Sequence, residues 1–375
     1  MSSTPPPSSS SPIPAHAVSE YMQWAKTRQA ARFNLGNSGL GAMTLAELGA
    51  RLEDIELSGP SFYGWPPLLE ALSRHLEVTV NRVCHAEGTS LANYLAMAVT
   101  LEPGDEVLVE SPSYELLVDT ARYLRAVVKR FPRPRSLGFQ PDLAALRAAL
   151  TPRTRLIVVT NLHNPSSVRI PDTTLLALAD LAAEVNARVL VDEVYLDAAF
   201  DPALRTAHRL SDRILTTSSL TKVYGLSGLR CGWVVAEPTL VERMWRLNDL
   251  LGVIPAHSAE RLSLVALREL PRLRARSASL LNANRDLWNQ FLAGRRELES
   301  DPLQYGTVAF PRLVLGSVDA LCERLRVPHE TTVTPGAFFG EPSAIRVGLG
   351  SSTEIFAEGL RRLGLALDEV VPRSA

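Results

Sequence analysis

The sequence predicts an α/β protein, with a large domain built on a mostly parallel sheet flanked by helices and a smaller α+β domain. Between residues 68 and 238, short apolar, β-branched runs alternate with helical stretches, which is typical of strands covered on both faces. After Pro238 the helical pattern is almost continuous to Arg296, and short strands follow it. The length of 375 residues fits about two such units.

The elements and domains can be placed along the chain from these patterns. A helix is expected at 18–31, before a Gly-rich loop at 34–41. Further helices are expected at 67–76, 89–101, 114–124, 142–150, 172–186 and 353–363. Strands are expected at 106–110, 126–131, 155–160, 188–192, 213–217, 231–235, 306–310 and 344–347. We expect residues 1–15 to form a disordered Pro/Ser-rich tail, 46–250 the large domain, and 16–45 with 251–375 the small domain.

Composition and charge exclude several classes of protein. The chain has 39 basic and 40 acidic residues and a net charge of −1, so no overall basic field attracts nucleic acid or an anionic membrane. Its apolar runs are much shorter than the roughly 20 residues of a membrane helix. The three cysteines, Cys84, Cys231 and Cys322, are widely spaced and favour neither a disulfide framework nor a zinc site, so a cytoplasmic location is expected. The seven histidines show no metal-ligand spacing.

Lysine is scarce, because only Lys26, Lys129 and Lys222 occur among the 39 basic residues. Arginine stays protonated and cannot act as an amine nucleophile, so lysine chemistry has three candidates. Lys222 follows an expected strand and has glycines and serines around it, with Arg230 eight positions on. A lone loop lysine is ordinarily a solvated charge. Here, an amine that forms an imine and a guanidinium that grips an anion suit a phosphorylated carbonyl cofactor. Lys129 in an expected strand and Lys26 in a polar helix match this role less well.

The stretch from Ser219 to Gly232, SLTKVYGLSGLRCG, resembles the active-site motif of class I/II aminotransferases, which are fold-type I pyridoxal-phosphate enzymes. The family pattern is Ser-x-[Ser/Thr]-Lys, a Gly-containing linker and Gly-x-Arg-x-Gly. The resemblance implies a large domain with a seven-stranded type of sheet and pyridoxal 5′-phosphate as cofactor. It also implies that Lys222 holds the cofactor covalently and moves the substrate Cα proton.

Residues around the implied cofactor ring follow in the family's order. Asp192 ends the expected strand 188–192, where it could simply cap a helix, but the resemblance implies that it pairs with the protonated pyridine nitrogen. Tyr195 and Asn164 are implied to contact the phenolic oxygen of the cofactor. Asn164 opens a turn similar to the family's Asn-Pro-Thr-Gly, although Ser167 replaces the usual glycine. Tyr114 is implied to stack on the ring, although packing at a helix start is an equal alternative for that residue alone.

A phosphate site is expected where Gly88, Thr89 and Ser90 open a helix. Free backbone N–H groups, the helix dipole and two hydroxyls suit a dianion, although ordinary capping would explain the same residues. The resemblance implies that Ser219 and Arg230 complete this cradle.

Three further residues carry roles implied only by the resemblance. Arg346, on the expected strand 344–347, is implied to bind the substrate α-carboxylate with its planar fork, together with Asn164. Gly36 aligns with the segment that covers the substrate. Tyr63 is implied to reach the phosphate of a neighbouring subunit, which predicts a homodimer with shared active sites.

The predicted function is transfer of an amino group between an L-amino acid and a 2-oxo acid. A lyase, a decarboxylase or a ring-forming enzyme of the same fold stays open, because sequence does not show which Cα bond is aligned for cleavage. A cofactor-binding regulator is a weaker alternative, since the segment before the fold leaves no room for a helix-turn-helix and no basic patch is present. No Gly-x-Gly-x-x-Gly turn follows a first strand, which disfavours a nicotinamide dehydrogenase.

Overall fold

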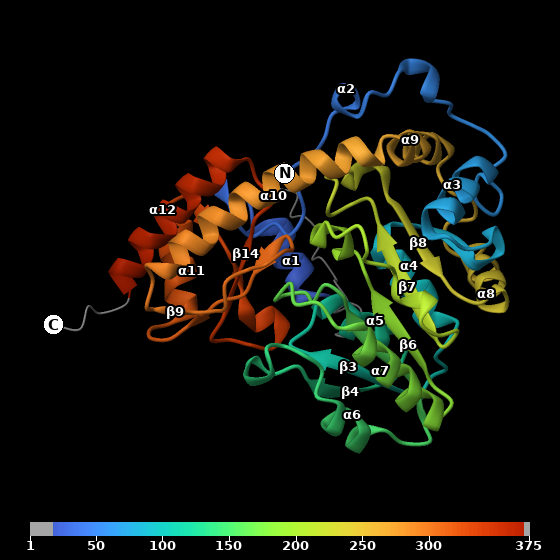
Figure 1. Cartoon of the computed structure of the whole chain (residues 1–375), viewed down its shortest axis with the longest axis horizontal. Coiled ribbons are helices and arrows are strands. Elements are labelled where there is room, and N and C mark those ends of the chain that lie inside the picture. The colour runs from blue at the N-terminus through green and yellow to red at the C-terminus, as the bar shows by residue number, and fades with distance from the viewer. Residues whose placement is uncertain (1–17, 371–375) are drawn as a thin grey trace, which may run out of the picture.

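The computed structural model describes residues 18–370, apart from the side chain of Val370, so the predicted tail at 1–15 lies outside the described residues. A seven-stranded sheet with its helices fills the right and lower parts of Figure 1. The C-terminal helices and a set of short strands lie beside it, on the left of the same view.

The central sheet has the strand order β2-β8-β7-β6-β5-β3-β4. Its strands are β2 (Val83–Glu87), β3 (Glu106–Ser111), β4 (Val127–Pro132), β5 (Thr154–Thr160), β6 (Arg188–Asp192), β7 (Ile214–Ser219) and β8 (Cys231–Val235). Every pair from β7 to β4 is parallel, whereas β8 runs antiparallel to both β2 and β7. The mostly parallel α/β sheet expected from the sequence is therefore confirmed.

Six of the seven central strands were expected, and their observed ends lie within two residues of the predicted ones. The edge strand β2 was not expected, because its sequence Val-Cys-His-Ala-Glu is short and poor in β-branched residues. It is buried in spite of this, since β8 pairs with it along its whole length.

Helices cover both faces of the sheet. They are α3 (Pro66–Leu76), α4 (Gly88–Ala98), α5 (Glu115–Tyr123), α6 (Leu143–Ala149), α7 (Asp172–Glu184) and α8 (Pro238–Asn248). Alternate residues of one strand enter different cores: Val107 and Val109 join the core that contains α4, and Leu108 joins the core that contains α7. This explains why the strands read as unbroken apolar runs in the sequence.

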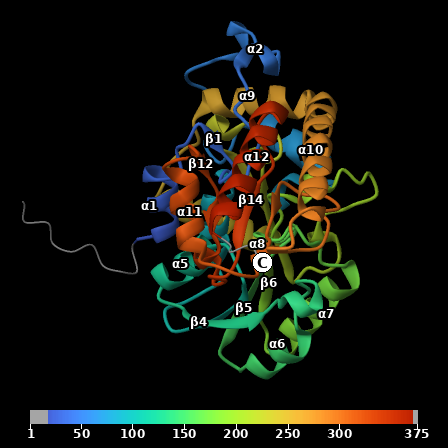
Figure 2. The same ribbon diagram turned by 90° about the vertical axis from the view of Figure 1, so that its left-hand side faces the viewer.

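The remaining elements include the short strands. Their helices are α1 (Glu20–Thr27), α2 (Leu45–Leu48), α9 (His257–Arg268), α10 (Leu270–Ala293), α11 (Val318–Arg326) and α12 (Thr353–Val370). Their strands are β1 (Phe33–Asn34), β9 (Leu298–Glu299), β10 (Val308–Ala309), β11 (Arg312–Leu313), β12 (Thr331–Thr332), β13 (Thr334–Pro335) and β14 (Ile345–Gly348). Among them, α9 packs against α3 and β8 of the sheet region. β1 pairs in parallel with β12, so the N-terminal segment lies beside C-terminal elements (Figure 2). Within residues 18–370, no helix is both long enough and apolar enough to cross a membrane.

Candidate active site

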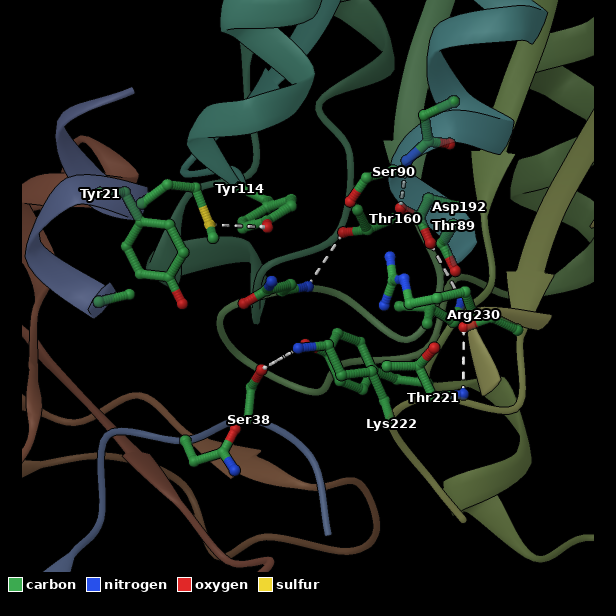
Figure 3. Close-up of a pocket in the computed structure, with 18 of the residues that line it drawn as sticks. Tyr21, Ser38, Thr89, Ser90, Tyr114, Thr160, Asp192, Thr221, Lys222 and Arg230 are labelled. Carbon is green, nitrogen blue, oxygen red and sulfur yellow. Dashed lines mark hydrogen bonds between the residues drawn. The ribbon is translucent and has the colours of Figure 1, made fainter. Parts of the chain in front are cut away.

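A cavity of about 330 Å³ opens at the carboxyl ends of β5, β6 and β7, where open α/β sheets place their ligands (Figure 3). Most of the predicted site residues line it. They are Thr89, Ser90, Tyr114, Asn164, Asp192, Tyr195, Ser219, Lys222 and Arg230. Segments separated by more than 100 residues in sequence thus supply one site.

Lys222 extends into the middle of the cavity from the loop that follows β7 (Figure 3). Its Nζ donates to Ser38 Oγ at 3.2 Å, and the Tyr195 hydroxyl donates to the same oxygen at 2.8 Å. Ser38 therefore connects the amine to the aromatic hydroxyl predicted to lie beside the cofactor. Gly39 allows this approach, because a Cβ there would lie 3.2 Å from the Lys222 backbone.

Asp192 is held at the end of β6 and is only 4% exposed. Asn93 Nδ2 donates to its Oδ2 at 2.8 Å, and the backbone N–H of Val194 donates to its Oδ1 at 3.0 Å. Burial raises the pKa of this carboxyl to about 6, although both hydrogen bonds oppose the shift. A buried carboxylate of this kind is stabilised by a cationic ligand, which a protonated pyridine nitrogen would provide.

The predicted phosphate site lies at the start of α4. Gly88 has a φ of +82°, and a Cβ there would lie 2.4 Å from Arg230 Nη2, so the guanidinium packs directly over the glycine. Thr89 Oγ1 and Thr221 Oγ1 are buried and have no hydrogen-bond partner within residues 18–370. Both hydroxyls can therefore donate to an anion bound beneath Arg230.

The turn that carries Asn164 is fixed by a buried carboxylate. Glu110 Oε1 accepts from both the N–H and the hydroxyl of Thr160, at 2.8 and 2.6 Å. Because the Thr160 hydroxyl donates its proton to Glu110, its oxygen is free to accept the Asn164 N–H at 3.0 Å. Arg133 Nη1 donates to Glu110 Oε2 at 2.6 Å, and neither partner of this ion pair is exposed.

Ser167, where the family has glycine, keeps the turn's backbone shape. Its φ is +63°, in the left-handed region that glycine favours, and its hydroxyl donates to the Val308 carbonyl at 2.7 Å. The substitution therefore leaves Asn164 in the cavity. His163 beside it packs within the loop, since its ring contacts Ser166 Oγ and the Pro112 carbonyl.

Arg346 lies behind Asn164 and is fully buried. Its Nη1 donates to Asn164 Oδ1 at 3.1 Å, and its Nη2 donates to the Tyr21 hydroxyl and to the Gly36 carbonyl at 3.0 Å each. Its Nε has no partner among the described residues. The structure thus brings the predicted carboxylate site and Gly36 together, next to the predicted cofactor site.

Tyr21 is a site residue that the sequence did not reveal. It stands on α1, and its ring packs edge-on against Tyr114 at a centroid distance of 5.6 Å. Burial opposes ionisation of its hydroxyl, but Arg346 and Lys222 outweigh burial and leave the pKa below its ordinary value. Glu115 holds the start of α1, accepting from the Tyr21 N–H at 2.7 Å and from the Ser19 hydroxyl at 2.9 Å.

Tyr63 is the one predicted residue that lies away from the cavity. Its hydroxyl accepts from Arg246, and its ring packs near Trp245 at a centroid distance of 6.1 Å. The ring is 45% exposed, and the neighbouring Phe62 is 72% exposed. Within one chain, Tyr63 therefore makes no contact with the site.

The geometry defines a class of protein, and the comparisons agree with it. The chain belongs to the aminotransferase class I and II family, whose model matches residues 53–363. Members of this family depend on pyridoxal phosphate, so the predicted family, fold class and cofactor are confirmed.

Two curated relatives differ in the reactions that their names state. The chain is 34% identical to capreomycidine synthase from Streptomyces vinaceus, over 74% of this chain and 72% of that protein. It is 31% identical to the arginine–pyruvate transaminase of Pseudomonas aeruginosa, over 78% of this chain and 77% of that protein.

Among solved structures, a PLP-dependent aminotransferase from Streptococcus suis superposes with a TM-score of 0.87. Its identity is 24%, and the match covers 94% of this chain and 98% of that one. A PLP-dependent cyclase matches with a TM-score of 0.84 and 24% identity, over 93% of this chain and 96% of that one. These likenesses support the fold.

Proposed function

We propose that this protein is an aminotransferase that moves an amino group between an L-amino acid and a 2-oxo acid. The carrying observation is the placement of Lys222 Nζ in one cavity with Asp192, Asn164 and Tyr195, with Arg346 one hydrogen bond away through Asn164. Pyridoxal phosphate supplies an aldehyde that links to amines and a ring that accepts the electron pair from a substrate Cα.

Each residue then has a physical role. Thr89, Ser90, Ser219 and Arg230 would hold the phosphate, Tyr114 would pack on the ring, and Asp192 would keep the ring nitrogen protonated. Asn164 and Tyr195 would hydrogen-bond the phenolic oxygen. Arg346 would grip the substrate α-carboxylate, and Lys222 Nζ would take the proton from Cα, because it is the amine that reaches the middle of the cavity.

The test is covalent labelling. Borohydride reduction followed by peptide mapping should place the cofactor on Lys222. Lys222→Ala should lower turnover by at least about 10³-fold while the protein keeps its fold. Lys129→Arg is the matched control, because it keeps the ion pair with Glu106, and it should retain both label and activity. A label on another residue, or near wild-type turnover of Lys222→Ala, would contradict the proposal.

A ring-forming or lyase reaction is the second candidate, because capreomycidine synthase and a PLP-dependent cyclase are among the relatives. Incubation of the loaded protein with amino acids, without any oxo acid, separates the two functions. Stoichiometric conversion to the aminated cofactor supports a transaminase. Continuous release of ammonia, carbon dioxide or a cyclic product supports the second candidate.

A homodimer with shared sites is also proposed. It is supported by exposed apolar side chains in the segment before Tyr63, Leu52 at 86% and Leu57 at 88% exposure, and by Leu250 after α8, at 82% exposure. Sedimentation of the loaded protein should give a dimer, and Tyr63→Ala should weaken cofactor binding by both subunits. A monomer with full cofactor affinity would contradict this.

The division into domains at 46–250, with 16–45 and 251–375 as the second unit, is proposed as well, and the pairing of β1 with β12 supports it. A cytoplasmic location is supported by the absence of pairing among the three cysteines.

A further inference from the structure

Helix α1 continues outward from the predicted carboxylate site. Tyr21 contacts Arg346, and Met22, Ala25, Lys26 and Gln29 also line the cavity. The spacing of Tyr21, Met22, Ala25 and Lys26 places them on one face of the helix, and Gln29 follows its C-terminal end. Lys26 is five residues beyond Tyr21, so the two Cα atoms are separated by about 7.5 Å along the helix axis. Helix α1 therefore supplies one wall of the cavity, next to the predicted carboxylate site.

The charges that line the whole cavity are unbalanced. The cations are Lys26, Lys222 and Arg230, and the one carboxylate among the lining residues is Asp192, beneath the predicted ring. Lys222 and Arg230 have roles with the cofactor, and Asp192 is matched by the ring nitrogen. Lys26 is the cation that the proposed function leaves unused.

Lys26 also has no partner in the described part of the chain. Of the other two lysines, Lys129 pairs with Glu106 at 2.7 Å and Lys222 donates to Ser38. No hydrogen bond or ion pair joins Lys26 to any residue between 18 and 370. An unpaired ammonium at the mouth of a cavity attracts anions and repels cations.

We propose that Lys26 binds the distal carboxylate of the substrate, so that the enzyme acts on dicarboxylic amino acids and their oxo acids. This inference rests on the proposed function, since Arg346 must hold the α-carboxylate. A guanidinium side chain would meet the Lys26 ammonium, and none of the α1 residues that line the cavity is a carboxylate. The substrate class therefore differs from the one named by the arginine–pyruvate transaminase.

The test uses unreactive acids, so that it does not depend on turnover. Glutarate and butyrate share the first carboxylate, and only glutarate has the second. Calorimetry on the loaded protein should show tighter binding of glutarate. Lys26→Gln should weaken glutarate binding by about 5- to 10-fold and change butyrate binding by less than about twofold. Lys26→Glu should weaken glutarate binding further.

Arg28→Gln is the matched control, because Arg28 loses the same charge from the end of the same helix but faces a different hollow, beside Glu323 and Arg326. It should leave both affinities unchanged. Equal loss of glutarate and butyrate binding in Lys26→Gln, or no loss of either, overturns the proposal. So does a wild-type preference for arginine over glutamate as amino donor. Failure to label Lys222 would instead overturn the proposed function, which keeps the two failures distinct.

Discussion

Replacing Asp192 with asparagine should stabilise the cofactor-free protein. The folded-state pKa of about 6 compares with an ordinary value of 3.8. Ionising the buried carboxyl at pH 7 therefore costs roughly 2.2 × 1.36, or about 3 kcal/mol, of folding free energy. The cost is absent below pH 3.8 and grows as the pH rises to about 6, because the folded state holds the proton more tightly than the unfolded state does.

The hydrogen bonds around Asp192 determine how much of this gain survives. In the wild-type protein, Asn93 Oδ1 accepts from the Thr217 hydroxyl at 2.6 Å. In the Asp192→Asn variant, the Asn93 amide can flip, so that this oxygen accepts from the amide nitrogen of the substituted side chain instead. The Thr217 hydroxyl then loses its acceptor, at a cost of about 1 kcal/mol. The expected net gain for Asp192→Asn is therefore about 2 kcal/mol at pH 7, shrinking as the pH falls toward 4.

The assay is urea denaturation of the cofactor-free protein at several pH values. Asp212→Asn is the control, because that carboxylate is 80% exposed, and its effect should stay within about 0.5 kcal/mol. In the cofactor-loaded protein, wild type should be more stable than Asp192→Asn, because only the wild-type side chain is a carboxylate that can pair with a protonated ring nitrogen. A cofactor-free Asp192→Asn variant that is less stable than wild type at every pH would refute this reasoning.

Two further predictions concern the phosphate site and the Asn164 turn. Arg133→Met should cost about 3–5 kcal/mol in urea denaturation, because it leaves Glu110 charged and buried, and less at pH 5 than at pH 8, since burial already raises the pKa of that carboxyl. The exposed pair Arg147–Glu184 provides the control, with Arg147→Met changing stability by at most about 1 kcal/mol; equal costs would contradict the argument. Gly88→Ala should weaken cofactor binding, measured by fluorescence titration, by at least about tenfold, because its Cβ would strike Arg230. Gly104→Ala has the same unfavourable backbone geometry with open space around it, and should leave cofactor affinity unchanged.

Motif residues could be placed from the sequence because each follows a recognisable strand or opens a helix. Asp192 ends β6, and Lys222 and Asn164 lie in the loops that follow β7 and β5. These strands are parallel, so their carboxyl ends meet at one edge of the sheet. Their meeting in one cavity therefore follows from the alternation of strands and helices. Tyr114 enters the cavity for the same reason, after β3.

Residues whose roles depend on tertiary contacts could not be identified from the sequence. Tyr21 meets Arg346 across 325 positions, and a tyrosine in a short polar helix gives no local sign of that contact. Asn93 lies on the buried, mostly apolar face of α4, and only its hydrogen bonds to Asp192 and Thr217 reveal its role. In the sequence, Glu110 and Arg133 look like ordinary charged residues near the ends of strands. Their burial follows from the pairing of β3 with β4.

Strand β8 is the single reversed strand of the central sheet. Because β7 and β8 are antiparallel neighbours, β7 ends and β8 begins at the same edge of the sheet. Lys222 and Arg230 therefore lie on the one loop that joins these two strands. In an all-parallel sheet, the next strand would begin at the opposite edge, so the residue in the position of Arg230 would lie far from the carboxyl end of β7. An engineer who transplants this chemistry to another α/β scaffold would have to carry the reversed strand along with the loop.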